Sequence, residues 1–423
     1  MTRKPRRRLT AAATAAVALV MAAATGAAAS TPGQGLTAAQ ATTAAPADTA
    51  APPSTWWYSA MGYDELHRYG TGKGITVAVL DDQVDPDVPE LKGRLASVKT
   101  FCDKGTAPTA SDTNADHGTN VASMIVGTGQ GTDGRDGVRG IAPDATLRYY
   151  TVAVRDNEEC SLAGQDDLMA RTLDQAVKDG AKIVSMSFDG TFFREKFIAA
   201  VARAQRAGVI LVSGTDDHGS VGYPALANGV VSVNYVDRRG KLGPGAAQGA
   251  SNAGFVDIAA PGVGMLLGSH VGGGWKTASY QANGSSLATP LVSGGLAAVW
   301  SHFPRATANQ LLQMMVHTPG LKKGTDQAGN PAWVYGFRRV GSSFPAVQNS
   351  NGGYGWGIFD PADMMYRHYQ QFPDTNPMLV KSNDPALKPT WSQVTGQPLP
   401  GQSASATAPS GSPATAPAGK SAA

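Results

Sequence analysis

The middle of the 423-residue chain alternates between short apolar runs and longer amphipathic stretches. The apolar runs are rich in β-branched residues, which predicts buried strands. They cover residues 74–81, 147–154, 182–188, 209–215 and 230–236. The amphipathic stretches 166–180 and 194–208 carry apolar residues at helical spacing and end at a glycine, which predicts helices. Alternating strands and helices are typical of a mostly parallel sheet with helices on both faces, so we expect an α/β fold.

Ligands of such sheets bind at the carboxyl ends of the strands, so polar residues at these ends are candidate site residues. Asp81 directly follows the apolar run ITVAVL. His117 lies in ADHGTNVASMIVG, just before a predicted helix whose Val121, Met124 and Ile125 share one face. Taken alone, Asp81 and His117 are each explained as a helix cap or a turn residue.

The segment NGSSLATPLVSGG (283–295) predicts a buried helix, because nearly every residue after Ser286 is apolar or small. Pro290 is tolerated in a helix only near its first turn. Two adjacent serines stand at the start of this helix. One explanation is an N-terminal cap. The other is a nucleophile, placed where the helix dipole and free N–H groups favour negative charge.

Together the three segments meet the requirements of a serine nucleophile. A hydroxyl needs a histidine to accept its proton and a buried carboxylate to hold that imidazole in the right tautomer. The chain order Asp81, His117, Ser286 is one of the known orders for such a triad.

The motifs VAVLDDQVD, DHGTNVAS and NGSSLATPLVSG resemble the three active-site motifs of the subtilisin-like (S8) serine peptidases. Further segments fit that family in the expected order, so the resemblance covers residues from about 56 to 365. They are GVRGIAPDATL, KIVSMSFDG, VGYPA, VDIAAPG and YGWGIFDP. The resemblance implies a subtilisin-like three-layer α/β fold, with Asp81 as the orienting carboxylate, His117 as the general base and Ser286 as the nucleophile. Ser285 is then its small neighbour.

The segment WWYSAMGYDELHRYGTGKG resembles the N-terminal segment of family members without a folded prodomain, including the actinobacterial mycosins. Mycosins are usually anchored by a C-terminal transmembrane helix, whereas the end of this chain has no apolar run able to span a bilayer. We therefore expect a released or cell-wall-associated protein with no membrane anchor in the mature chain.

The active-site motifs also depart from the family pattern. After Asp81 the family usually has a small residue and a glycine, where this chain has Asp82 and Gln83. The second histidine of the usual HGTH motif is replaced by Asn120. Because that histidine is not the base, we expect this replacement to have little effect.

The most serious departure lies in VILVSGT. The family usually ends this strand with Ala-Gly-Asn, where the asparagine amide donates to the oxyanion; the aligned residues are Ser213, Gly214 and Thr215. Removing one such donor from a subtilisin costs about 10²–10³ in turnover. The threonine hydroxyl is a shorter donor. Two functions therefore stay open: a serine endopeptidase with an atypical oxyanion hole at Thr215, and a weak or inactive pseudoprotease that binds peptides.

The resemblance also implies where a peptide substrate binds. In the family the peptide substrate adds as a strand beside the segment at the end of KIVSMSFDG. The expected substrate-binding residues are therefore Ser187, Phe188, Asp189 and Gly214. Asp189 stands where glycine is usual, and two more acids follow at 216–217. These acids either favour a basic side chain before the scissile bond or are solvated loop residues.

The N-terminus changes the interpretation of charge. The basic start MTRKPRRR, the run of small and apolar residues and the alanines at 27–29 predict a signal peptide over residues 1–29. It holds five of the 35 Lys and Arg residues and no acid, so the remaining chain carries 30 basic and 32 acidic residues. No basic patch argues for nucleic acid. We expect a secreted protein, exported by either the general or the twin-arginine route.

Composition also divides the chain. Residues 30–54 are an Ala/Thr/Pro-rich linker, 55–369 form the peptidase domain, and 370–423 are a low-complexity Pro/Ala/Ser-rich tail. Cys102 and Cys160 are the only cysteines, and in an exported protein one disulfide between them is the simplest expectation; the alternative is two free thiols. Their spacing is not of a metal-binding type, and GTDGRDG (131–137) lacks an EF-hand register, so we expect no metal or cofactor. We expect a monomer whose partner is a protein or peptide substrate.

Overall fold

The computed structural model describes residues 55–102, 106–154, 160, 166–190, 194–248, 255–279, 282–325, 331–335 and 352–400. All of them belong to one unit of the chain, residues 50–423. The predicted signal peptide, the predicted linker up to residue 54 and the predicted tail from residue 401 onward lie outside the described residues.

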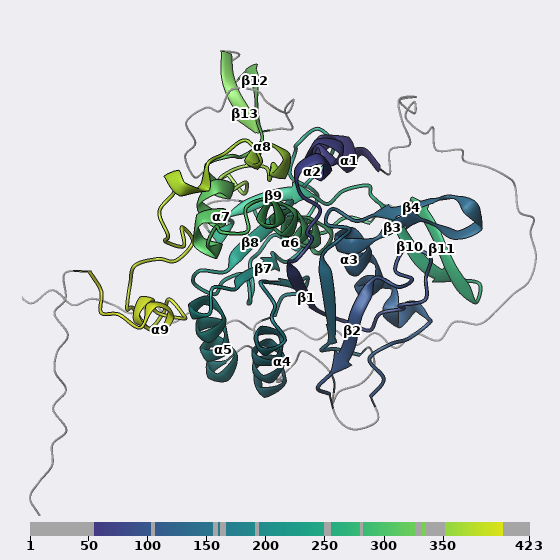
Figure 1. Ribbon diagram of the computed structural model, residues 1–423, viewed down its shortest axis with the longest axis horizontal. Coiled ribbons are helices and arrows are strands. Elements are labelled where there is room, and N and C mark those ends of the chain that lie inside the picture. Colours follow the sequence, from purple (N-terminus) through teal and green to yellow (C-terminus); the bar gives the residue numbers. More distant parts are fainter. Residues whose placement is uncertain are drawn as a thin grey trace, which may run out of the picture. The chain divides into compact units, whose positions relative to one another are not determined.

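A seven-stranded sheet forms the centre of the fold (Figure 1). Its order is β2-β5-β1-β6-β7-β8-β9, and every pair of neighbours is parallel. The strands are β1 (Thr76–Asp81), β2 (Leu95–Thr100), β5 (Thr146–Thr151), β6 (Ile183–Met186), β7 (Ile210–Gly214), β8 (Val231–Val236) and β9 (Ile258–Pro261). Five of them confirm the predicted strands. The other two, β2 and β9, are the edges, and β2 is only partly buried, which explains its weak apolar pattern.

Helices cover both faces of the sheet. Successive side chains of a strand point to opposite faces, and the strands carry apolar side chains on both. Val77 and Val79 of β1 belong to the core cluster that also contains the apolar residues of α3 and α6. Ala78 and Leu80 belong to a second cluster with those of α4 and α5. These helices are α3 (Asp116–Val126), α4 (Asp166–Lys178), α5 (Glu195–Arg206) and α6 (Ser285–His302). The predicted three-layer α/β fold is confirmed.

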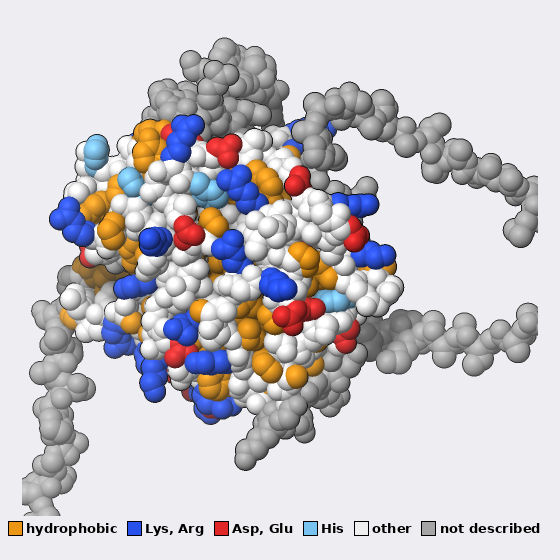
Figure 2. All heavy atoms as spheres, turned by 45° about the vertical axis from the view of Figure 1, so that its right-hand side comes forward, with side chains coloured by type: hydrophobic (Ala, Val, Ile, Leu, Met, Phe, Trp, Pro, Cys, Tyr) orange, Lys and Arg blue, Asp and Glu red, His pale blue; other side chains and the backbone are white. Residues whose placement is uncertain are grey.

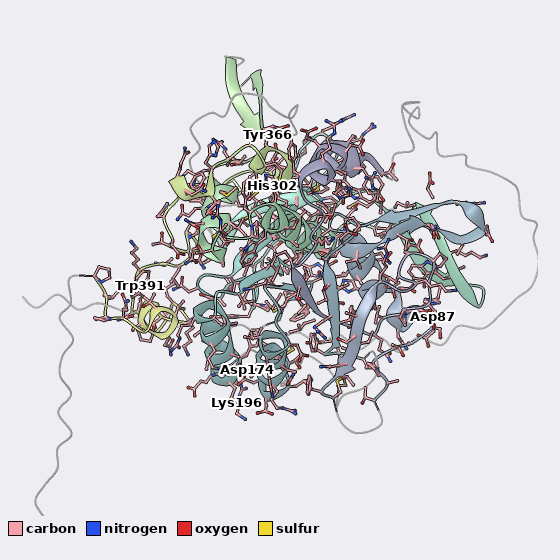
Figure 3. The ribbon with its side chains drawn as sticks, viewed as in Figure 1. Asp87, Asp174, Lys196, His302, Tyr366 and Trp391 are labelled. Atoms are coloured by element: carbon pink, nitrogen blue, oxygen red, sulfur yellow. A yellow bond between two sulfur atoms is a disulfide. The ribbon has the colours of Figure 1, made fainter. Side chains whose placement is uncertain are left out.

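Helices α4 and α5 confirm the two predicted amphipathic helices. Each is slightly shorter than the sequence suggested, and they lie side by side, with Asp174 and Lys196 shown on them in Figure 3. Surface ion pairs join them, Asp167 to Lys196 at 2.8 Å and Asp174 to Arg203 at 2.7 Å. Such exposed pairs contribute about 0–1 kcal/mol each, so the buried apolar faces hold these helices to the sheet.

Helix α6 is buried along nearly its whole length, as its uniformly apolar sequence predicted. Pro290 lies in its second turn, near the helix start as expected. A proline there has no N–H to give to the carbonyl four residues earlier, which is that of Ser286. The hydroxyl of Ser187, just after β6, donates to this carbonyl oxygen at 3.0 Å. The missing helical bond is thereby replaced by a link between β6 and α6.

The remaining elements lie around this core. Two antiparallel hairpins, β3–β4 and β10–β11, pack near α3, and the GTDGRDG segment forms the turn of the first. The hairpin strands are β3 (Thr128–Gln130), β4 (Asp136–Arg139), β10 (Leu266–Val271) and β11 (Gly274–Ser279). The other short elements, in chain order, are α1 (Trp56–Ala60), α2 (Tyr63–Tyr69), η2 (Thr113–Ala115), η3 (Thr132–Gly134), α7 (Ala308–Val316), β12 (Leu321–Thr325), β13 (Pro331–Tyr335), α8 (Pro361–Met364), η6 (Tyr369–Gln371) and α9 (Trp391–Thr395).

The C-terminal segment packs on the domain well past residue 369, where the sequence placed the start of the tail. Helix α9 lies beside α5, and Leu379 and Val394 bury against Ala202 of α5. Thr390 and Gln393 form a capping box at the start of α9. The packed part of the chain therefore includes residues up to 400 in the structure.

Three findings concern the chemistry of the whole domain. A disulfide joins Cys102 and Cys160, as the sequence predicted. Among the described residues, no helix is both long and apolar enough to cross a membrane. Figure 2 shows basic side chains scattered among apolar and uncharged ones on the face that it presents.

Candidate active site

The last residue of β1 and the start of α3 bring a carboxylate and an imidazole together. Asp81 is 2% exposed, and its Oδ1 accepts a hydrogen bond from Nδ1 of His117 at 2.6 Å. His117 is the second residue of α3, and its side chain is 38% exposed. Because the carboxylate holds the proton on Nδ1, Nε2 is left as the ring atom that can accept another proton. This is the arrangement that a general base requires.

Three carboxylates determine the charge state of His117. Burial lowers the pKa of His117, but the charge and hydrogen bond of Asp81 and the charges of Asp82 and Asp217 outweigh it and raise the pKa to about 9. Asp217 lies beyond β7, so its effect shows that the loop after β7 reaches the same site. The imidazolium form is therefore favoured at neutral pH.

Ser286 lies in the first turn of α6, directly after Gly284 and Ser285. The first N–H groups of a helix have no acceptor within the helix and favour negative charge nearby. The hydrogen bond from Ser187 to the Ser286 carbonyl fixes this turn against the end of β6. A nucleophile at this position has helical N–H groups beside it to stabilise an oxyanion.

Ser285 has a different task from Ser286. Its hydroxyl donates to the carbonyl oxygen of Thr215, and its backbone N–H donates to Oδ1 of Asp217 at 2.8 Å. The cap at this helix end therefore comes from Asp217, a residue that lies far away in the sequence, and not from either serine. The two serines, which the resemblance distinguished as nucleophile and small neighbour, also differ in these contacts.

Thr215, which the sequence predicted to face the oxyanion, has a buried hydrogen-bond partner in the structure. It is 3% exposed, and its Oγ1 donates to Oδ1 of Asn234 on β8 at 3.4 Å. Asn234 in turn donates to two backbone carbonyls, those of Ala247 and Gly353. The Thr215 hydroxyl thus belongs to a buried hydrogen-bond network, and its oxyanion role stays a prediction.

The predicted substrate-binding residues lie at the carboxyl ends of β6 and β7. Ser187, Phe188 and Asp189 follow β6 directly, and Gly214 ends β7. A Cβ on Gly214 would lie 2.8 Å from Oγ of Ser285, so glycine is needed there for close packing against α6. Their contact with substrate stays a prediction.

The acids of this region influence one another. Burial raises the pKa of Asp189, and the charges of Asp216 and Asp217 raise it further, while that of His218 lowers it. A Cβ on Gly222 would lie 3.0 Å from Oδ2 of Asp189, so this carboxylate lies against the VGYPA segment (221–225). The three acids therefore lie in one region beside the end of β6.

Asn120 has a role that the sequence did not predict. Its amide donates to the carbonyl of Asp116 and to that of Gly268 on β10, both at 2.8 Å, and its oxygen accepts from the Gly268 N–H at 2.8 Å. The hairpin β10–β11 is thereby tied to the helix that carries His117. No local pattern reveals this link, because Gly268 is remote in the sequence.

A second histidine reinforces this attachment. His270 of β10 bonds Asp116 through Nδ1 at 2.7 Å and Asp85 through Nε2 at 3.0 Å. Asp116 directly precedes His117, so the start of α3 is held from the β10 side as well.

One group of described residues has the side chains to hold a metal ion. Ligand atoms of Asp81, Asp82 and His117 lie within 4.8 Å of one another. The hydrogen bond between Asp81 and His117 accounts for the proximity of that pair. That pair is therefore explained without a metal.

Comparison with known proteins bears on the same region. Residues 72–357 match the family described as the subtilase family. The chain is 34% identical over 267 residues to a thermostable alkaline protease of Halalkalibacterium halodurans, which covers 62% of this chain and 67% of that protein. It is 30% identical over 261 residues to subtilisin E of Bacillus subtilis, covering 60% of this chain and 62% of that protein.

Solved structures agree in fold. Fervidolysin from Fervidobacterium pennivorans, a keratinolytic enzyme, superposes with a TM-score of 0.57 at 23% identity, over 76% of this chain and 46% of that one. MycP1 from Mycobacterium smegmatis superposes with a TM-score of 0.55 at 20% identity, over 79% of this chain and 89% of that one. The chain thus spans less than half of fervidolysin, and at these identities both likenesses concern the fold. Because the family match covers more than half of the sequence, the protein belongs to the subtilase family of serine endopeptidases.

Proposed function

We propose that the protein is a secreted serine endopeptidase in which Asp81, His117 and Ser286 form the catalytic triad. The observation that carries the proposal is the 2.6 Å hydrogen bond from His117 Nδ1 to the buried Asp81. The position of Ser286 in the first turn of α6 supports the same assignment. These residues are the ones that the family motifs select.

The proposed reaction uses these three side chains. Nε2 of His117 takes the proton of the Ser286 hydroxyl as Oγ attacks the carbonyl carbon of the peptide, and Asp81 stabilises the imidazolium. The tetrahedral oxyanion collapses, the C–N bond breaks, and His117 returns the proton to the leaving amine. Water, deprotonated in the same way, then hydrolyses the ester on Ser286 and releases the acid.

The substrate is proposed to lie as an added strand beside residues 187–189 and Gly214. Main-chain hydrogen bonds in this mode supply affinity that does not depend on sequence. The carboxylates at 189, 216 and 217 then favour Lys or Arg before the scissile bond.

Export is proposed from two features. Residues 1–29 have the sequence of a signal peptide, and the Cys102–Cys160 disulfide fits an oxidising compartment. The mature protein is proposed to be a monomer outside the cell or at the cell wall, which the N-terminal sequence and light-scattering mass of protein from the culture medium would test.

A second candidate function is a peptide-binding pseudoprotease. It is favoured by the Thr215 hydroxyl, which donates to Asn234 within the core. With that donor engaged elsewhere, the oxyanion is left to the helical N–H groups, and turnover is expected to be slow.

Labelling with a fluorophosphonate probe separates the two functions. The protein without residues 1–29 is expected to be labelled on Ser286, because the probe needs a nucleophile activated by His117. Ser286→Ala should abolish labelling, whereas Ser285→Ala removes the neighbouring hydroxyl and should leave Ser286 labelled. A folded sample that takes no label would contradict the endopeptidase and favour the pseudoprotease.

A further inference from the structure

The carboxylate of Asp217 lies at the N-terminus of α6, beside Ser286. Its Oδ1 accepts the hydrogen bond from the Ser285 N–H at 2.8 Å. A Cβ placed on Gly284 would lie 2.7 Å from Oδ2 of Asp217 and 3.2 Å from Oγ of Ser286. Oδ2 and the Ser286 hydroxyl therefore border the same small space in front of the helix.

The oxyanion of the proposed reaction forms beside Ser286 Oγ, where the N–H groups of the first turn point. The Thr215 hydroxyl is engaged with Asn234. We infer that Asp217, and not Thr215, supplies the side chain that faces the oxyanion, and that its ionised carboxylate holds turnover back. This inference rests on the proposed role of Ser286.

The charge of this side chain decides its effect. An ionised carboxylate has no hydrogen to donate and repels a second negative charge forming next to it. A protonated carboxyl in the same place is a donor, and apolar surroundings can keep a carboxyl protonated in other enzymes. Burial raises the pKa of Asp217, while its hydrogen bonds with Ser285 lower it. Other groups that share an electrostatic interaction with Asp217 are Asp216 and His218 on its own loop, His117 on α3, Asp189 after β6 and Tyr235 on β8.

The proton arrangement that catalysis requires on His117 and Asp217 is the reverse of the one that is favoured. Catalysis needs a neutral His117 and a protonated Asp217. The pKa of about 9 for His117 instead favours the imidazolium, and with Asp217 ionised, as inferred here, the site holds the same total number of protons. The competent form is then a minor tautomer. Its population is nearly constant between the two pKa values and falls above that of His117.

Replacing the carboxylate by an amide tests this. In Asp217→Asn the amide oxygen keeps the bond from the Ser285 N–H, so the NH₂ group takes the place of Oδ2 and becomes a permanent donor. We expect kcat on a fluorogenic peptide to rise by at least about tenfold at neutral pH, since one oxyanion donor contributes about 10²–10³. KM should change little. The ratio of the variant's kcat to that of the parent should grow with pH, because only the parent needs a protonated carboxyl.

A matched control is Asp237→Asn. Asp237 lies outside the site, and its carboxylate likewise accepts hydrogen bonds from backbone N–H groups, those of Arg239 and Lys241 in a turn. The Asp237→Asn variant should have the same kcat and the same pH profile as the parent. Asp217→Ala, which removes the charge without adding a donor, should give a smaller rise and serves if the asparagine variant does not fold.

The outcomes separate this inference from the proposed function. If the probe labels Ser286 in the parent and neither Asp217 variant raises kcat, Asp217 is not the oxyanion-facing residue, while the endopeptidase stands. If Ser286 is labelled in neither the parent nor a folded Asp217 variant, both the proposed function and this inference are overturned. A rise in kcat that is independent of pH would overturn the requirement for a protonated carboxyl.

Discussion

The hydroxyl of Ser187 donates to the backbone carbonyl of Ser286 at 3.0 Å, so the end of β6 holds the first turn of α6. This bond exists because Pro290 cannot make the helical bond to the same carbonyl. The proposed nucleophile and the proposed peptide-binding strand are thereby fixed to each other by one side chain. Under the proposed function, a substrate aligned on this strand is then also aligned on Ser286.

Ser187→Ala is expected to lower both stability and turnover. The Ser286 carbonyl would lose its side-chain partner, and because this bond is partly buried the loss is expected to cost about 1 kcal/mol. Urea unfolding and kcat on a peptide substrate measure the two effects. Ser185→Ala on β6 is the matched control, because the buried hydroxyl of Ser185 has no hydrogen-bond partner among the described residues. Equal losses in both variants would show that the bond contributes nothing.

The imidazole of His117 is expected to titrate near pH 9. NMR of the ring protons, assigned by comparison with His117→Ala, measures the midpoint. Asp82→Asn should lower it, because the charge of Asp82 raises the pKa of His117. Asp144→Asn, whose carboxylate accepts from Thr71, should leave it unchanged. An ordinary midpoint in the folded parent would contradict the Asp81–His117 interaction.

The same shift links stability to pH. The folded pKa of His117 is above the ordinary value of 6.5, so the folded protein holds this proton more tightly than the unfolded chain. The resulting stabilisation is fully present below about pH 6.5 and is lost as the pH rises through about 9. The free energy of unfolding should therefore fall over this range in the parent and less steeply in His117→Ala.

Asn120→Ala is expected to loosen the β10–β11 hairpin from α3. The buried N–H and carbonyl of Gly268 would both lose their partner, and each such loss costs about 1–3 kcal/mol. The control is Asn309→Ala, since the Asn309 amide bonds only the surface carboxylate of Asp374 among the described residues. Urea unfolding compares the two. Equal stability of both variants would restore the expectation that Asn120 matters little.

The acids beside the end of β6 are expected to set a preference for basic side chains. Asp189→Gly should reduce the ratio of kcat/KM for peptides with Lys before the scissile bond to that for Leu by roughly fivefold, because a partly exposed ion pair contributes up to about 1 kcal/mol. Asp133→Gly in the β3–β4 turn is the control. An unchanged ratio in Asp189→Gly would mean that these acids are solvated loop residues.

The sequence by itself determined five of the seven strands of the sheet, the helices α3 to α6 and the candidates for the triad. Local periodicity decides which segments bury a face, and parallel strands bring the polar residues at their carboxyl ends to one edge of the sheet. Asp81 and His117 could be selected for this reason, and their hydrogen bond is found in the structure. The pairing of the two cysteines followed from their number and the expected compartment.

Only the tertiary structure decided which side chains meet at the start of α6. Alignment of a short strand selected Thr215, and the structure adds that its hydroxyl bonds Asn234 while Asp217 bonds the Ser285 N–H. The sequence likewise did not predict the roles of Asn120 and of residues 370–400, because their partners are remote in the sequence. Contacts between distant segments depend on loop geometry and packing, and no local pattern of apolar and polar residues encodes them.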